Sequence, residues 1–331
     1  MMDLLSNYGL FLAKTVTIAV AIIFVSGMIA SIFVRGKSPK QSSLKVKNLN
    51  EQYRKYARAL EMETLSKYRF KQILKEEKKK RKLDRKKEKV SDSGKRRVFV
   101  LNVNGDIKAS AVDLLREEIS ALLMVAGGKD EVVLRLESTG GMVHSYGLAA
   151  SQLQRLREKG ITLTIAVDKV AASGGYMMAC VADRVIAAPF AIIGSIGVVA
   201  QIPNINKLLK RHDIDYEQIT AGKYKRTLTV MGENTDAERE KVKQELEETH
   251  HLFKDFVLQR RQALNIEEVA TGEYWYGSRA LELKLVDELK TSDDYLMVAA
   301  LSADLFEVSY EVKRSLSQRL PLAVQGWLDR I

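Results

Sequence analysis

The sequence is poor in the residues that build disulfide frameworks and metal centres. Its 331 residues include one cysteine, four histidines and four prolines. The lone Cys180 cannot form an intrachain disulfide, and the histidines are too scattered along the chain to suggest a zinc site. Cys180 also falls within an apolar stretch, where a thiol is usually inert. These absences exclude a disulfide-stapled domain and a Cys/His metal centre.

Positive charge is concentrated in one segment. The chain has a formal net charge of +11, and residues 35–98 hold 24 Lys and Arg against 8 Asp and Glu. Few large apolar residues accompany these charges, so we interpret residues 35–96 as a solvated basic linker. Its charge favours anionic lipid headgroups. No recognition motif or interleaved stacking aromatics occur there, so we expect no nucleic-acid partner.

A long uncharged stretch lies near the amino terminus. Twenty consecutive, mostly apolar residues extend from Thr15 to Val34, enough to cross the hydrocarbon core of a bilayer as a helix. The alternative is a cleaved signal peptide, whose apolar core would be shorter and preceded by basic residues. Here the basic residues follow the run, starting at Arg35. We therefore predict a single-pass anchor over residues 1–34, and the positive-inside rule favours a cytoplasmic position for the rest of the chain.

Strand and helix patterns alternate beyond the basic segment. Strand-like runs cover 98–103, 131–136 and 161–167, and amphipathic helical patterns cover 110–125 and 143–159. Short glycine-rich turns connect these runs. The alternation predicts an α/β domain over residues 97–331, built from repeated strand-turn-helix units with much of its sheet parallel.

Two successive strands run into glycine pairs. The first is followed by Glu137-Ser138-Thr139-Gly140-Gly141 and the second by Ala171-Ala172-Ser173-Gly174-Gly175. We expect Ser173 at the start of a helix over residues 176–182, where free backbone N–H groups favour negative charge. A serine there can be a nucleophile with glycine amides as its oxyanion site. The alternative is that Ser173 only caps the helix.

A serine nucleophile needs a base, and no motif places an Asp-His pair beside Ser173. A lysine can serve where burial lowers its pKa towards neutrality, because desolvation disfavours the ammonium form. Lys223 and Lys225 in Ala221-Gly-Lys-Tyr-Lys-Arg226 are the candidates. In an extended segment the two side chains would point the same way, so periodicity leaves the choice open.

Four motifs together resemble the signal peptide peptidase A family of membrane serine proteases. They are Glu-Ser-Thr-Gly-Gly at 137–141, Val-Ala-Ala-Ser-Gly-Gly-Tyr at 170–176, Ile-Gly-Ser-Ile-Gly-Val at 193–198 and Gly-Lys-Tyr-Lys at 222–225. The resemblance extends from the anchor to about residue 315. It implies a crotonase/ClpP-type fold and a Ser-Lys dyad, with Ser173 as nucleophile and Lys225 as general base.

The resemblance also implies the rest of the site. Gly141 and Gly174 would form the oxyanion hole, and Ser195 would line the substrate site, although a plain turn is an equally good interpretation of Ser195. Thr139 and Lys284 stand where the family usually has proline and glycine, and neither change removes a predicted catalytic group. No metal or organic cofactor is implied.

The sequence therefore predicts a membrane-anchored serine endopeptidase of the bacterial inner membrane. The resemblance implies peptide substrates such as remnant signal peptides, and homo-oligomeric rings whose sites draw residues from neighbouring protomers. Two alternatives are a non-catalytic membrane scaffold of the same fold and a crotonase-like acyl-transfer enzyme. The presence of Ser173, Lys225 and both glycine pairs argues against the scaffold, and the membrane anchor disfavours the acyl-transfer enzyme.

Overall fold

The computed structural model describes residues 9–12, 14–22, 42–88 and 95–312. Residues 9–12 and 14–22 are helical, and no helix in these described ranges is both long and apolar enough to cross a membrane. Residues 23–34, which complete the predicted anchor, lie outside the described residues.

The described chain alternates strands and helices along its length. The strands are β1 (Ser42–Asn48), β2 (Arg97–Gly105), β3 (Glu131–Ser138), β4 (Thr162–Val167), β5 (Val170–Ala172), β6 (Arg184–Ala187), β7 (Ile192–Gly194), β8 (Tyr274–Tyr276), β9 (Glu288–Leu289) and β10 (Asp304–Val312). The helices are α2 (Leu49–Thr64), α3 (Lys67–Glu88), α4 (Val112–Val125), α5 (Val143–Glu158), α6 (Gly174–Ala179), α7 (Asn206–Arg211), α8 (Asp236–Leu258), α9 (Ile266–Val269), α10 (Gly277–Glu282) and α11 (Ser292–Ala299).

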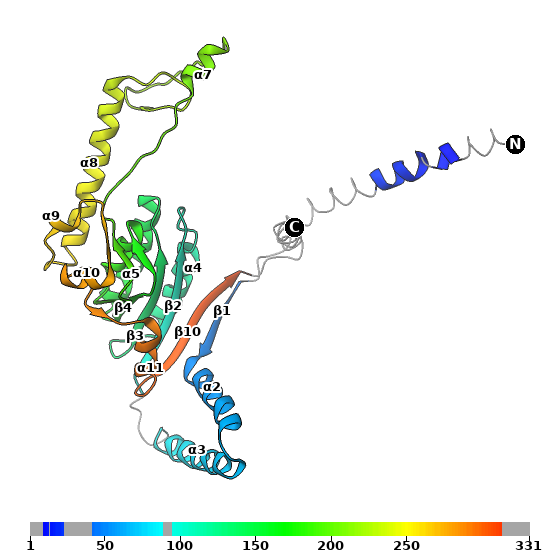
Figure 1. Ribbon diagram of the computed structural model, residues 1–331, viewed down its shortest axis with the longest axis vertical. Coiled ribbons are helices and arrows are strands. Elements are labelled where there is room, and N and C mark those ends of the chain that lie inside the picture. Colours follow the sequence, from blue (N-terminus) through cyan, green and yellow to red (C-terminus); the bar gives the residue numbers. More distant parts are fainter. Residues whose placement is uncertain (1–8, 13, 23–41, 89–94, 313–331) are drawn as a thin grey trace. The chain divides into compact units, whose positions relative to one another are not determined.

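The strands form one sheet, whose main path has the order β1-β10-β2-β3-β4-β6-β9. Each pair from β10 to β9 along this path is parallel, and β7 with β8 is antiparallel. On one face, Leu101 and Leu134 of the strands share an apolar core with Leu115 of α4 and Leu153 of α5. Figure 1 shows these two helices beside the sheet. A parallel sheet needs such cover, because its crossover helices pack on its faces. The α/β class predicted from the sequence is confirmed.

The strand-to-helix turn at Ser173 is built differently from the prediction. Strand β4 ends at Val167, and a separate strand, β5, follows before Ser173. Ala171 of β5 pairs with Ser138 at the end of β3, and Ala172 pairs with Gly194 of β7. Three residues are too few to give a strand period, so the sequence did not reveal β5. This strand sets Ser173 beside the turn that follows β3.

The predicted boundary at residue 97 also differs from the structure. Strand β1 joins the sheet beside β10, and α2 begins with the buried residues Leu49 and Asn50. The Asn50 side chain donates hydrogen bonds to the carbonyl oxygens of Ala300 (3.2 Å) and Ala303 (3.0 Å), and it accepts one from the N–H of Leu305 (2.7 Å). The prediction of a linker is therefore wrong for residues 42–50, which belong to the sheet and to the buried start of α2. The sequence did not reveal this, because the partners of Asn50 lie some 250 positions away.

Candidate active site

Ser173 occupies a strained turn between β5 and α6. Its φ of 51° and ψ of −120° form a conformation that residues with a Cβ rarely adopt. The Ser173 N–H donates to the Gly194 carbonyl at 2.7 Å, which ties the turn to β7. The side chain is half-exposed and makes no hydrogen bond with any residue that the structure describes. The turn therefore presents the free Ser173 hydroxyl at the end of a buried strand, as a nucleophile requires.

The turn after β3 lies directly against Ser173. Gly140 has a φ of 88°, and a Cβ built on it would lie 2.7 Å from the Gly174 nitrogen and 2.8 Å from the Ser173 Cβ. Only glycine fits so close to another backbone. The sequence analysis singled out Gly141 and Gly174, whereas Gly140 is the residue that makes the two turns meet.

Both predicted oxyanion donors lie at this junction. A Cβ on Gly141 would overlap the Ile107 carbonyl, and the neighbouring Met142 N–H donates to that same oxygen at 2.8 Å. Within the described chain, the N–H groups of Gly141 and Gly174 have no acceptor. Two free backbone donors next to a serine hydroxyl are what an oxyanion hole requires.

Ser195 begins the segment that leaves the Ser173 turn after β7. It follows β7, has a φ of 49°, and its N–H donates to the Glu273 carbonyl at 2.7 Å. Its hydroxyl donates to the Gly272 carbonyl at 3.3 Å. A pocket of about 390 Å³ opens here between the segment after β7 and helix α8, and it is lined by Ser195, Gly197, Val198, Val199, Lys243, Leu246, Glu247, His250, Thr271 and Gly272.

The structure does not bring Lys225 into contact with Ser173. Its N–H donates to the Gly222 carbonyl at 3.1 Å, and its side chain is exposed, with no ion-pair partner in the described ranges. The adjacent Tyr224 ring lies 5.0 Å from Lys223 Nζ and 5.5 Å from Lys241 Nζ, at the start of α8.

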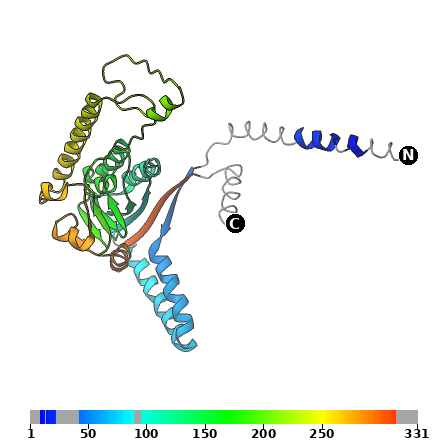
Figure 2. The ribbon, with the colours of Figure 1, turned by 45° about the horizontal axis from the view of Figure 1, so that its top comes forward.

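The hydrogen bonds and ion pairs described for residues 204–234 stay within that segment. Both ribbon views show its helix α7 beyond the amino-terminal end of α8, away from α9 and α10 (Figures 1 and 2). The single chain thus brings the predicted nucleophile and the free amides together but leaves the predicted base apart from them.

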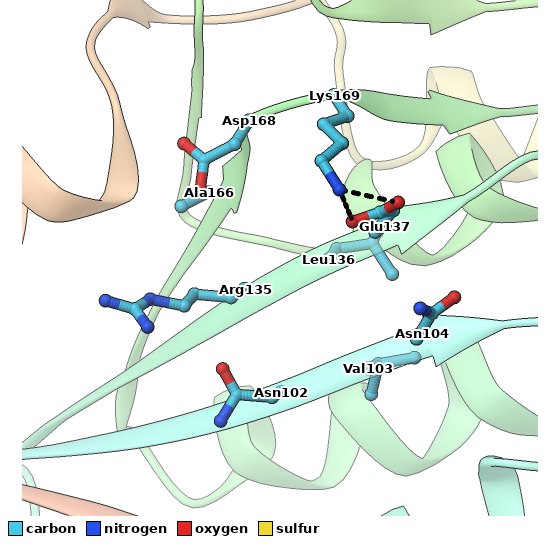
Figure 3. A pocket seen from close by; sticks show the side chains of 9 residues that line it. All are labelled: Asn102, Val103, Asn104, Arg135, Leu136, Glu137, Ala166, Asp168 and Lys169. Carbon is cyan, nitrogen blue, oxygen red and sulfur yellow. Dashed lines mark hydrogen bonds and ion pairs between the residues drawn. The ribbon is translucent and has the colours of Figure 1, made fainter.

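A second pocket lies on the sheet face opposite α4 and α5. The first half of this face is apolar, where Val98, Val100 and Val133 pack with Leu296 and Leu305. Figure 3 shows the second half, a pocket of about 220 Å³ lined by Asn102, Val103, Asn104, Arg135, Leu136, Glu137, Ala166, Asp168 and Lys169. Lys169 Nζ pairs with Glu137 at 3.0 Å. This lining holds amides and charges but no hydroxyl or thiol, so it offers no nucleophile.

Cys180 is the other nucleophilic group near the turn. It lies just after α6, fully buried, and its Sγ donates to the Met177 carbonyl. Burial raises the pKa of its thiol to about 12. The thiolate is the reactive form, so Cys180 is not the nucleophile of this site.

Two family models match consecutive parts of this chain. The model described as peptidase family S49 N-terminal matches residues 3–153, and the model of peptidase family S49 matches residues 155–305. The chain belongs to peptidase family S49. It is thus a peptidase, and the resemblance predicted from the four motifs is confirmed.

Other S49 proteins match along nearly the whole chain. The probable protease SohB of Haemophilus influenzae is 52% identical over 326 residues, which cover 96% of this chain and 92% of that protein. The protein of the same name from Buchnera aphidicola subsp. Acyrthosiphon pisum is 49% identical over 323 residues, 98% and 95% of the two chains. Among solved structures, a membrane-bound stomatin-specific protease in complex with a substrate peptide aligns with a TM-score of 0.43 and 14% identity. That alignment covers 70% of this chain and 98% of the other.

Proposed function

We propose that this S49 peptidase is a serine endopeptidase that uses Ser173 as nucleophile and Lys225 as general base. The observation that carries the proposal is the Ser173 turn, where a strained serine with a free hydroxyl adjoins the unpaired N–H groups of Gly141 and Gly174. Neutral Lys225 takes the Ser173 proton as Oγ attacks the peptide carbonyl carbon, and the two amides receive the oxyanion. The lysine then protonates the leaving amine, and water hydrolyses the acyl ester.

Lys225 would come from a neighbouring copy of the chain. An exposed lysine is a poor base, because its ammonium form is well solvated, and contact with a second copy would desolvate it. Exposed apolar side chains on the same segment, among them Leu208, Ile214 and Ile219, favour such a contact. The proposed active enzyme is therefore a homo-oligomer.

The peptide substrate would bind along the segment after Ser195. Backbone groups of residues 197–200 make no hydrogen bonds to the described chain, and Val198 and Val199 line the 390 Å³ pocket. An unpaired backbone edge can add an extended peptide by main-chain hydrogen bonds, while the pocket takes a side chain.

The proposed location is the bacterial inner membrane, with residues 15–34 as the single span and the peptidase domain on the cytoplasmic side. Peptides at or near the bilayer, such as remnant signal peptides, are the substrate class that this location favours. The basic segment would contact anionic lipids. Basic residues flank the exposed apolar side chains of Leu60, Met62 and Tyr68 near the turn between α2 and α3. Stronger binding of the protein to phosphatidylglycerol vesicles than to phosphatidylcholine vesicles would support this contact.

A fluorophosphonate probe tests the nucleophile. The probe should label the wild-type protein in detergent and fail to label Ser173→Ala, while Ser151→Ala, which removes an exposed serine of α5, should label normally. Equal labelling of Ser173→Ala would assign the chemistry to another residue.

Mixed oligomers test the source of the base. Ser173→Ala and Lys225→Ala are each expected to be inactive, but subunits exchanged between them should recover activity, because one copy then supplies the serine and the other the lysine. No recovery after verified subunit exchange would argue that both groups act within one chain.

A further inference from the structure

Two buried hydroxyls lie beneath the Gly140 turn and have no place in the chemistry described so far. Ser138 and Tyr146 are each only 1% exposed, and their oxygens lie 2.6 Å apart. The Gly140 N–H donates to Ser138 Oγ at 3.1 Å, and the Tyr146 hydroxyl donates to the Asp106 carbonyl at 2.8 Å. The hydroxyl pair therefore connects the turn after β3 to the turn after β2.

The direction of every proton in this chain of hydrogen bonds is fixed. A carbonyl oxygen can only accept, so the single Tyr146 proton is used on Asp106. Ser138 must then donate its own proton to Tyr146 Oη, which leaves a Ser138 lone pair to accept from Gly140. Burial also raises the pKa of the Tyr146 phenol, so this proton stays in place at neutral pH. The array has one orientation, from the Gly140 N–H to the Asp106 carbonyl.

Glycines make room for this pair on three sides. A Cβ on Gly105 would lie 2.5 Å from both hydroxyl oxygens, and one on Gly175 would lie 2.5 Å from the Ser138 carbonyl. A Cβ on Gly174 would overlap the Tyr146 ring. Tyr146 thus supports both candidate oxyanion segments, one through Ser138 and the other by direct packing against Gly174.

We propose that Ser138 and Tyr146 are positioning residues that hold the Gly141 and Gly174 amides at the spacing required by the oxyanion. The proposal rests on the proposed function, because it assigns these amides to the oxyanion hole. An oxyanion donor acts only on the transition state, so its misplacement should lower kcat more than it changes KM. Removal of one such donor typically costs about 10²–10³ in rate, and a displaced donor should cost less, roughly tenfold.

The test compares Tyr146→Phe with Tyr176→Phe in the full-length protein in detergent. Tyr176 is equally buried, and its hydroxyl donates to the Leu285 carbonyl at 2.9 Å. Tyr176→Phe therefore removes a buried hydroxyl without changing the Ser138–Tyr146 hydroxyl pair. With quenched fluorescent casein as substrate, Tyr146→Phe should lose about tenfold in kcat with KM and the pH profile unchanged. Tyr176→Phe should stay within about twofold of wild type.

The inhibition constant of a tripeptide aldehyde distinguishes a positioning role from a merely structural one, because a loss of folded enzyme alone would leave that constant unchanged. Ser173 Oγ bonds to the aldehyde carbon as its proton passes to Lys225, and the C=O π electrons move to the carbonyl oxygen, which occupies the oxyanion position of the hemiacetal. The inhibition constant should therefore rise in Tyr146→Phe by the same factor as the loss of kcat/KM. Ser138→Ala should show the same rise in inhibition constant. The double variant Ser138→Ala/Tyr146→Phe should lose no more activity than the more impaired of the two single variants, because the two hydroxyls act as one unit.

Equal kcat values for the two tyrosine variants, or additive losses in the double variant, would overturn the positioning role. If Tyr146→Phe does not fold, as judged by circular dichroism, Ser138→Ala alone decides by its aldehyde inhibition constant. Failure of the proposed function is a separate result, in which the wild-type protein neither reacts with the fluorophosphonate nor binds the aldehyde.

Discussion

Replacement of Ser173 by glycine should abolish activity and at the same time stabilise the fold. The Ser173 backbone, with φ at 51° and ψ at −120°, lies where a Cβ is unfavourable, at a cost on the order of 1–3 kcal/mol. Glycine removes that cost but gains about 0.5–1 kcal/mol of unfavourable chain entropy. The Ser173 hydroxyl makes no hydrogen bond within the described chain, so its loss adds little.

The comparison of Ser173→Gly with Ser173→Ala isolates the backbone term, because both variants lack the hydroxyl. Ser173→Gly should be more stable by about 0.5–2 kcal/mol. Urea unfolding in detergent, followed by circular dichroism, measures this difference. With a slope of about 3 kcal/mol/M, the midpoint of Ser173→Gly should lie roughly 0.2–0.7 M higher. Both variants should be inactive.

A helical serine supplies the control with the opposite sign. Ser151 lies inside α5, where glycine is about 1 kcal/mol less favourable than alanine. Ser151→Gly should therefore unfold at lower urea than Ser151→Ala. If Ser173→Gly also unfolded at lower urea than Ser173→Ala, the Ser173 turn would store no strain, and its backbone conformation would cost the fold no stability.

Three further predictions follow from other parts of the molecule. Lys225→Arg should be as inactive as Lys225→Ala in casein hydrolysis, because arginine keeps its proton near neutral pH. Lys223→Ala should keep most activity. An inactive Lys223→Ala beside an active Lys225→Arg would assign the base to Lys223. Asn50→Ala should lower the free energy of unfolding by about 2–4 kcal/mol in urea titration, since three hydrogen bonds of about 0.5–1.5 kcal/mol each are lost from a buried side chain. An unchanged midpoint would show that this segment is a linker after all. Cys180 in the folded protein should resist iodoacetamide at mildly alkaline pH and should react once the protein is unfolded in urea. Burial raises the pKa of its thiol to about 12, so little thiolate is present in the folded state. Rapid labelling of the folded protein would contradict its burial.

The sequence predicted the parts of the fold that depend on local pattern. Continuous apolar runs predicted the long strands β3 and β4, an amphipathic pattern predicted the helix α4, and the glycine pairs marked where turns bring backbones together. The Ser173 turn could be located in this way because the apolar run at 161–167, the small residues and the helix pattern after them are contiguous in the sequence, although the short strand β5 between them was not predicted.

Features that depend on distant partners could not be predicted. Asn50 is a polar residue in a basic stretch, and only its contacts with residues 300–305 reveal that it is buried. Ser138 and Tyr146 are ordinary residues of a turn and a helix until β3 and α5 bring their hydroxyls together. No local signal distinguishes a buried hydroxyl that holds a turn from one that faces solvent.

The predicted catalytic groups lie on two kinds of structure. Ser173 and the free N–H groups of Gly141 and Gly174 belong to segments held by β-pairing and by the Ser138–Tyr146 hydroxyl pair. Lys225 lies on an exposed segment whose described hydrogen bonds are local. A serine hydroxyl without a base is a weak nucleophile, so under the proposed function an isolated chain would hold its oxyanion hole and yet cleave peptides slowly. Under the proposed function, assembly supplies the one missing group. Activity would then depend on contact between copies held in the same membrane rather than on any rearrangement of the Ser173 turn.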